Sequence, residues 1–168
     1  MPRHAAFLVV CTIGLGACGS ASESSRPVDE SATTRATSTA RSDIDALPVG
    51  TPKLDCGSDL ESMGVLEPST GAQGERPEEA LWELLRATAV LAPLAVEVPA
   101  ELTMEHTGSG FRLAGRAEAP AQVLHVALED RDRVIGVFDL TGTADGRWLG
   151  TSYGFCYETV RGLTGMTR

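Results

Sequence analysis

The chain has 168 residues and a mass of 17.6 kDa, which is enough for one domain once an export segment is subtracted. Its 23 acidic residues outnumber 14 Lys and Arg, giving a formal net charge of -9. An acidic chain without a run of basic residues argues against nucleic-acid binding, because that affinity comes from neutralising phosphates. A mean hydropathy of -0.02 and one continuous apolar stretch, at the start, exclude a protein with several membrane spans.

The first residues have the pattern of a secretory signal peptide. Arg3 precedes an apolar run over residues 5–14. A run of about ten residues suits the core of a signal peptide and is too short to cross a bilayer as a helix. Gly14, Gly16 and Gly19 crowd its end and a polar tract follows, which argues against a buried helix of the folded domain. The sequence therefore predicts export.

The segment Leu15-Gly16-Ala17-Cys18 resembles the lipobox of bacterial lipoproteins. In that family an apolar residue stands three positions before the cysteine, and two small residues follow it. The resemblance implies cleavage between Ala17 and Cys18 and a diacylglyceryl group on the Cys18 thiol. Each buried methylene contributes about 0.8 kcal/mol, so two or three acyl chains hold a protein firmly. The expected location is the extracytoplasmic face of the cell membrane, reached through this lipid anchor.

Residues 19–46 consist of Ser, Thr and Ala with scattered charges and almost no large apolar side chain. Such a segment cannot bury enough surface to offset its ordering entropy, so it is predicted to be a disordered tether. A flexible coil of about thirty residues has a root-mean-square span of about 30 Å. The Ser and Thr content leaves O-glycosylation open, although an unmodified spacer is favoured. The expected division is a signal peptide over 1–17, the lipidated cysteine and tether over 18–47, and a globular domain over 48–168.

Within the domain, one helix is predicted over residues 75–86. Pro77 suits the first turn, and Glu78 and Glu79 lie where the helix dipole is positive. Leucines recur at helical spacing after them, and the helix is predicted to end before Pro93.

Four strands are predicted to follow, over residues 111–116, 121–129, 133–141 and 147–158, with turns at residues 130–132 and at Asp145-Gly146. Leu124, Val126 and Leu128 alternate on one face of the second strand. The predicted fold class is α+β: one N-terminal helix packed on a small antiparallel meander of about four strands. The charged run over residues 129–133 is interpreted as a solvated hairpin tip.

Two cysteines remain for the mature domain, because Cys11 leaves with the signal peptide and Cys18 is assigned to the lipid. In an exported chain two leftover cysteines most often pair, so a disulfide is expected between Cys56 and Cys156. It would close a loop of about 100 residues, for which the chain-entropy model gives about 4.7 kcal/mol. A redox couple or a metal site is the alternative, and neither has the expected C-x-x-C spacing or histidine cluster.

Signals of catalysis are sparse. The sequence lacks G-x-S-x-G, H-E-x-x-H and a glycine-rich phosphate loop, and no metal or cofactor is predicted. His106 and His125 are candidates for a base or a ligand, weighed against a structural role at the sheet surface. Trp148 and Tyr153 are candidates for lining a ligand cleft, weighed against filling the core around Cys156.

The order of features also resembles small actinobacterial lipoproteins of uncharacterised function: a lipobox, a spacer, a Cys-Gly pair, a Pro-Glu-Glu-Ala helix and strands ending in a Trp-containing strand with a cysteine. The resemblance implies no activity. Two hypotheses remain. One is a non-enzymatic binding module that meets an envelope protein or a cell-wall component. The other is a small cone-shaped ligand carrier or enzyme with His125 or His106 in a pocket. A cavity in which a histidine and a carboxylate converge would favour the second.

Overall fold

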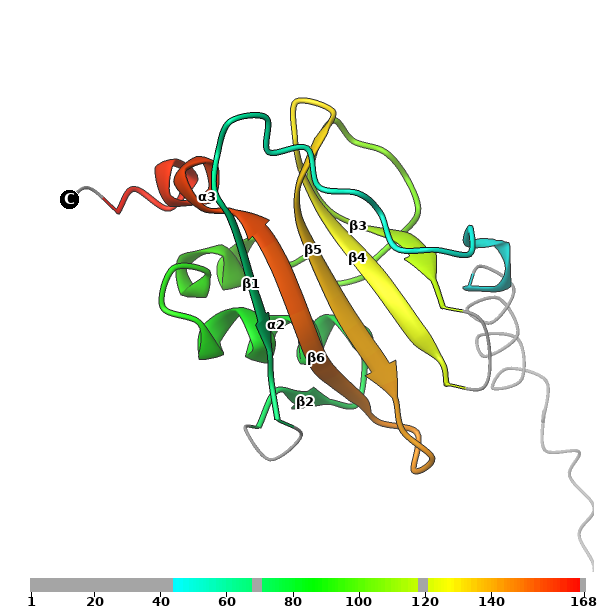
Figure 1. Ribbon diagram of the computed structural model, residues 1–168. Coiled ribbons are helices and arrows are strands. Elements are labelled where there is room, and N and C mark those ends of the chain that lie inside the picture. Colours follow the sequence, from blue (N-terminus) through cyan, green and yellow to red (C-terminus); the bar gives the residue numbers. More distant parts are fainter. Residues whose placement is uncertain (1–43, 68–70, 118–120, 167–168) are drawn as a thin grey trace, which may run out of the picture.

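The computed structural model describes residues 44–67, 71–117 and 121–166, so the predicted signal peptide and most of the tether lie outside the described residues. Within them, six strands form one antiparallel sheet: β1 (Glu61–Val65), β2 (Gln73–Gly74), β3 (Ser109–Arg116), β4 (Val123–Asp130), β5 (Arg133–Gly142) and β6 (Trp148–Cys156). The helices are α2 (Pro77–Ala87), the 3-10 helix η2 (Ala92–Glu97) and α3 (Tyr157–Leu163) (Figure 1). The predicted mixed α+β class is confirmed.

The four predicted strands are present as β3 to β6, each antiparallel to the next and each within two residues of its expected bounds. Both hairpin turns fall where turn residues stand in the sequence. Arg131 and Asp132 have φ of 51° and 66°, so this two-residue turn has the backbone twist that suits a hairpin. Gly146 has φ of 84° in the turn between β5 and β6, a conformation that glycine adopts without a steric penalty.

Helix α2 covers one face of the sheet, and η2 lies beside it (Figure 1). Pro77 occupies the first turn of α2 as predicted, and Leu81, Leu84 and Leu85 are fully buried. They pack against the face that we call the back, together with the alternating apolar side chains of the central strands. Large fully buried strand residues are Leu124, Val126, Ile135, Phe138, Leu140 and Phe155. The hydrophobic core thus lies between the helices and the sheet.

Two details of the expected architecture are wrong. The main helix is not N-terminal in the domain, because β1 and β2 precede it, and the sheet has six strands where about four were expected. Both added strands pair with β6 on the side away from β5. They escape sequence detection because β2 has two residues and β1 alternates only weakly, with Gly64 inside it. The last predicted strand also ends early, since α3 begins at Tyr157.

The opposite face of the sheet, the front, is crossed by the segment from Leu47 to Cys56 (Figure 1). This segment first borders β3, where the N–H of Arg116 donates to Pro48 and the N–H of Gly50 donates to Arg116, both at 2.9 Å. It then passes over β4 and β5 and reaches the expected disulfide, which joins Cys56 to Cys156 at the end of β6. The crossing segment and the outermost strand, β1, therefore border the front face on two sides.

Candidate functional site

A row of polar side chains runs across the front face. The strand register places His125 on β4 opposite Asp139 on β5, and Asp139 opposite Ser152 on β6. Val65 on the outermost strand, β1, stands opposite Ser152, so an apolar side chain ends the row. Residues directly opposite each other in a sheet project from the same face. The register therefore brings together side chains that are far apart in the sequence.

The row forms one hydrogen-bonded chain. Nδ1 of His125 lies 2.7 Å from Oδ1 of Asp139, and the other carboxylate oxygen accepts the Ser152 hydroxyl. On the other side of the ring, Nε2 lies 3.4 Å from Oγ1 of Thr51, which the crossing segment supplies. One ring nitrogen therefore faces the Asp139 carboxyl group and the other faces the Thr51 hydroxyl. The buried imidazole is thus held in one orientation by both neighbours.

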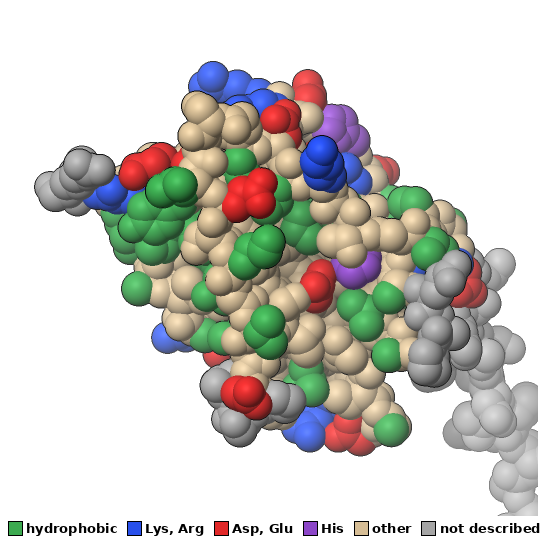
Figure 2. Space-filling view, viewed as in Figure 1, with side chains coloured by type: hydrophobic (Ala, Val, Ile, Leu, Met, Phe, Trp, Pro, Cys, Tyr) green, Lys and Arg blue, Asp and Glu red, His purple; other side chains and the backbone are tan. Residues whose placement is uncertain are grey.

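Beside this chain a cavity of about 730 Å³ opens on the front face. One wall is residues 51–54 of the crossing segment and the other is β1. Figure 2 views this face, over which hydrophobic side chains are interspersed with charged ones. His125 does not line the cavity itself but bonds to two residues that do. The lining residues are Thr51, Pro52, Lys53, Leu54, Glu61, Met63, Gly64, Val65, Val137, Asp139, Ser152, Tyr153 and Gly154.

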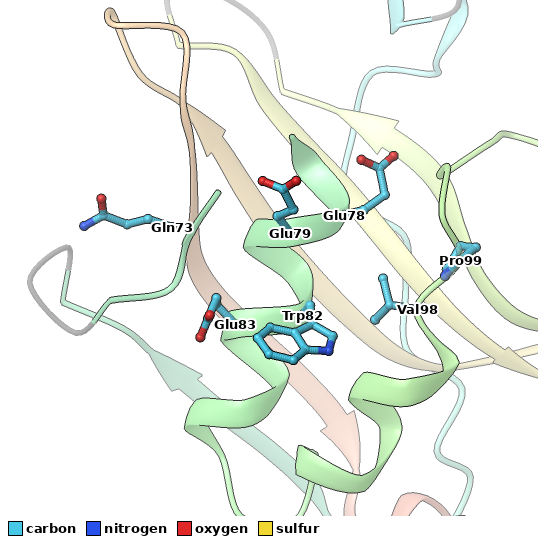
Figure 3. A pocket seen from close by; sticks show the side chains of 7 residues that line it. All are labelled: Gln73, Glu78, Glu79, Trp82, Glu83, Val98 and Pro99. Atoms are coloured by element: carbon cyan, nitrogen blue, oxygen red, sulfur yellow. The ribbon is translucent and has the colours of Figure 1, made fainter. Parts of the chain in front are cut away.

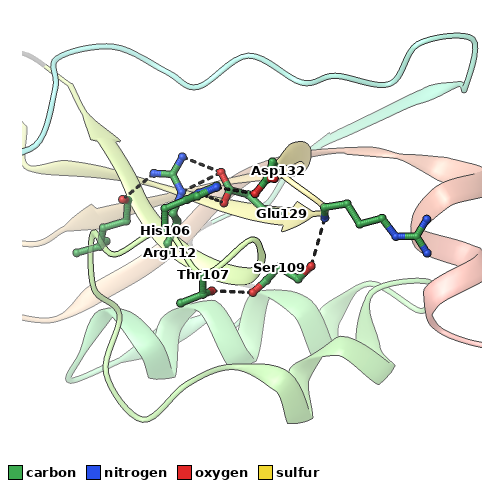
Figure 4. A network of polar contacts seen from close by, with 8 residues as sticks. His106, Thr107, Ser109, Arg112, Glu129 and Asp132 are labelled. Atoms are coloured by element: carbon green, nitrogen blue, oxygen red, sulfur yellow. Dashed lines mark hydrogen bonds and ion pairs between the residues drawn. The ribbon is translucent and has the colours of Figure 1, made fainter.

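The second histidine belongs to a separate network at the end of β4 (Figure 4). His106 has Nδ1 at 2.8 Å from Glu129 and Nε2 at 2.7 Å from Asp132. Arg112 on β3 donates to Glu129 through Nε at 2.8 Å and approaches it through Nη2 at 2.7 Å. In this network each carboxylate contacts a basic side chain: Glu129 contacts His106 and Arg112, and Asp132 contacts His106. Its geometry is that of a structural brace between a loop and two strands.

This network corrects the interpretation of the charged hairpin. Asp132 lies at the tip as expected, but the Glu129 side chain is only 3% exposed. Glu129 follows an apolar neighbour on β4, and its side chain projects from the sheet. It is buried because Arg112 and His106 cover it there. The hairpin tip is the two-residue turn Arg131–Asp132 and begins two residues later than the charge pattern suggested.

A smaller cavity of about 420 Å³ lies between α2 and the chain that follows η2, with Trp82 at its centre (Figure 3). Two of its three acidic residues have partners: Glu78 accepts the N–H of Leu102 at 2.8 Å, and Glu79 accepts another backbone N–H at 2.9 Å. The Arg86 guanidinium lies 4.4 Å from the Trp82 ring centroid. The ring and two of the three carboxylates are thus engaged within the domain, and this cavity is a poorer candidate site.

The other predicted site residues are separated by the fold. Tyr153 borders the front cavity and also packs against the core, whereas Trp148 is a buried core residue at the start of β6. The structure therefore does not unite these two aromatic residues in one cleft. Ala17 and Cys18, which carry the predicted cleavage and lipidation, lie outside the described residues.

Three residues of the polar chain were missed by sequence reasoning: Thr51, Asp139 and Ser152. Asp139 had a detectable signal, because it is an acidic residue in the middle of an otherwise apolar strand. Its pairing with His125 was not predictable in the same way, because the register between β4 and β5 shifts at a bulge after Leu128. Thr51 and Ser152 had no such signal, since small hydroxyl residues are common in loops and strands.

No protein-family model, curated protein or solved structure shows a significant match to this chain. Among the described residues, no helix is long and apolar enough to span a membrane, and no group of three acidic, histidine or cysteine side chains is arranged to hold a metal ion. The front cavity and its polar chain are thus the features on which a function can be argued.

Proposed function

We propose that this protein is a lipid-anchored, extracytoplasmic binding module, and that its ligand occupies the front cavity. The observation that carries this proposal is the cavity itself: about 730 Å³ beside a fixed chain of His125, Asp139 and Ser152. That size is within the range of small-molecule sites, which combine apolar walls with a few placed polar groups. Anchoring follows from the lipobox resemblance around Cys18, and the Ser- and Thr-rich segment supplies the spacer.

The lining defines the chemistry of the ligand. Leu54, Met63 and Val65 present apolar side chains, and Asp139 with Ser152 presents a polar end. A ligand with an apolar body and one hydrogen-bond donor at its end complements such a lining. A large anion does not, because the carboxylates of Glu61 and Asp139 outnumber the one cation of the lining, Lys53.

The ligand-binding role is tested with matched arginine substitutions. Val65 is 82% exposed and lines the cavity, whereas Val96 is 81% exposed on η2 and does not. Val65→Arg should lower the affinity for the neutral dye Nile red about tenfold or more, because it places a charged side chain in an apolar site. Val96→Arg should leave it unchanged. Fluorescence titration of the non-acylated Cys18→Ser chain measures both, and equal affinities in the two variants would refute a site in this cavity.

Anchoring is tested separately. Cys18→Ala removes the thiol that would carry the acyl chains, which are the strong membrane attachment the sequence offers. The variant should move from the membrane and detergent phase to the aqueous fraction. If it still partitions wholly with membranes, the lipid assignment is wrong while the cavity proposal stands.

One observation favours a second candidate, an acyl hydrolase. Asp139, His125 and Thr51 follow one another in the order of an orienting acid, a base and a hydroxyl nucleophile. Nε2 would take the hydroxyl proton as Thr51 attacks an ester carbonyl and return it to the departing alcohol, after which water would release the acid. Thr51→Ala should then abolish hydrolysis of p-nitrophenyl acetate and Thr51→Ser should retain it. Equal rates in wild type and both variants would exclude this activity.

A further inference from the structure

The two edges of the sheet are unequal. Beyond β3, the backbone is covered: Pro48 and Gly50 bond to Arg116, and the N–H of Leu113 donates to Thr103 at 2.7 Å. Beyond β1, no described strand pairs, since β6 is its partner on the inner side. An open edge presents unpaired N–H and C=O groups, and most proteins protect such edges with a cover, a bulge or a proline. The described part of the chain protects one edge only.

The pairing of β1 with β6 fixes which backbone groups face outward. The N–H of Tyr157 donates to Leu60, and the N–H of Leu66 donates to Thr151, both at 2.8 Å. Hydrogen-bonded pairs alternate along an antiparallel ladder, so the even-numbered residues of β1 face β6. The N–H and C=O groups of Glu61, Met63 and Val65 therefore point to the open edge. They repeat every two residues, about 6.8 Å apart.

Side chains on β1 add to this edge. Glu61, Met63 and Val65 line the front cavity, so their side chains project from the front face. Met63 is 70% and Val65 82% exposed, and Glu61 is the single charged residue of the strand. Pairing with β6 runs through β1 without a register shift, in contrast to the three central pairings. The edge is thus regular, apolar at two positions and acidic at the third.

We propose that β1 is a strand-addition site, which an extended segment of a partner polypeptide joins as a further antiparallel strand. Only another extended backbone matches a row of alternating donors and acceptors. The partner's front-facing residues would be apolar opposite Met63 and Val65 and basic opposite Glu61. A second copy of this chain is disfavoured as the occupant, because each chain has a net charge of -9 and brings no basic residue to β1. The inference goes beyond ligand binding in the cavity and does not depend on it.

A backbone-specific probe tests this inference. The fluorescein-labelled peptide Lys-Thr-Val-Thr-Val-Thr-Lys places Lys and Val on one face in either direction. It should bind the Cys18→Ser chain, as measured by fluorescence anisotropy, and should slow amide hydrogen exchange within residues 61–65. The same peptide with N-methyl groups on both valines keeps every side chain but loses the two edge-facing donors. Its affinity should be lower by about tenfold or more.

The protein-side variant is Met63→Pro. Proline is tolerated on an edge strand where its nitrogen faces outward, so the pairing with β6 should persist while the edge is blocked. Peptide affinity should again fall about tenfold or more, whereas the conservative control Met63→Leu should match wild type. The proposal is overturned if both peptides bind equally, if neither binds, or if wild type is a dimer that Met63→Pro converts to a monomer. The methylated peptide decides the question even if Met63→Pro does not fold.

Discussion

Glu129 is a buried acidic residue whose carboxylate is contacted by two neighbouring side chains. Its carboxylate receives Arg112 on one oxygen and His106 on the other, and its side chain is 3% exposed. Arg112→Ala should lower the free energy of unfolding by about 3 kcal/mol, because it leaves a buried charge with one partner fewer. Asp145→Asn, in an exposed pair with Arg147, should cost less than about 1 kcal/mol. Urea unfolding at neutral pH measures both, and equal costs would contradict the structural role of the network.

Asp59 gives a residue-level prediction for pH. Burial acts to raise the pKa of its carboxyl, but the backbone N–H groups of Glu158 and Thr159 together lower the pKa below its ordinary value. A depressed folded-state pKa means that the contribution is present above the unfolded pKa and is lost as pH falls through the folded one. Asp59→Ala should therefore lower stability by about 1 kcal/mol at pH 7, the usual cost of removing a side-chain acceptor from a helix N-terminus. The difference in stability between the variant and wild type should shrink below about pH 4. Thermal melts between pH 7 and that range measure this difference. A difference that stays constant with pH would contradict the role assigned to Asp59.

Single residues were predictable from the sequence only where their chemistry is rare. His106 and His125 attracted attention as the two histidines of the domain, and Cys56 and Cys156 paired by elimination. What the sequence could not supply was the neighbour of each histidine. The partner of His125 depends on the register between β4 and β5, which shifts at a bulge after Leu128. A shift of one residue reverses the face of every later side chain, so such neighbours require the structure.

At the level of elements, the contact between α2 and β6 depends on a residue without a side chain. A β carbon at Gly150 would come 2.7 Å from Cβ of Leu84, whereas one at Gly162 in α3 would meet no atom within 4 Å. Gly150→Ala should destabilise the fold by about 1–3 kcal/mol through overpacking. Gly162→Ala should stabilise it by about 0.5–1 kcal/mol through helix propensity. Denaturant unfolding measures the change in the free energy of unfolding for both variants. If both changes have the same sign, the packing of α2 against Gly150 does not determine the effect of the substitution.

The elements that the sequence predicted are those with a sustained period. The central strands alternate over eight or more residues, and α2 repeats its leucines on one side through eleven. β1 and α3 were missed because five and seven residues leave little pattern, and each contains a glycine. β1 is also exposed on its front side, so burial did not select apolar residues there consistently. The edge that we propose as a strand-addition site was therefore the part of the sheet least visible in the sequence.

For the whole molecule, the crossing segment joins the start of the domain to the edge strand β3 and to β6, the neighbour of the other edge strand. It borders β3 at Pro48, supplies Thr51 to His125, and ends at Cys56, which is bonded to β6. Length and composition predicted a change near Leu47, since polar residues give way to apolar ones there. They did not predict that the first residues of the domain would form a wall of the front cavity. The candidate site thus depends on the same segment that connects the domain to its proposed anchor.

The whole-molecule prediction concerns where an independently folding chain must begin. Leu47 is 3% exposed and belongs to the core, its carbonyl accepts Nε–H of Arg116 at 3.2 Å, and Ile44 packs against the same core. A chain that begins at Ile44 should therefore unfold cooperatively with the stability of the Cys18→Ser chain. A chain that begins at Pro48 should be less stable by about 2–3 kcal/mol, the contribution of one buried leucine.

Urea unfolding of the two shortened chains, with the disulfide intact, measures this difference. Leu47→Ala in the chain that begins at Ile44 isolates the side chain from the backbone, and it should account for most of the loss. Val49→Ala is the matched control, because Val49 is 51% exposed and contributes little burial. If the chains that begin at Ile44 and Pro48 are equally stable, Leu47 does not anchor the crossing segment. In that case the front wall of the cavity must be held by Cys56 and the contacts of Pro48 and Gly50 with Arg116.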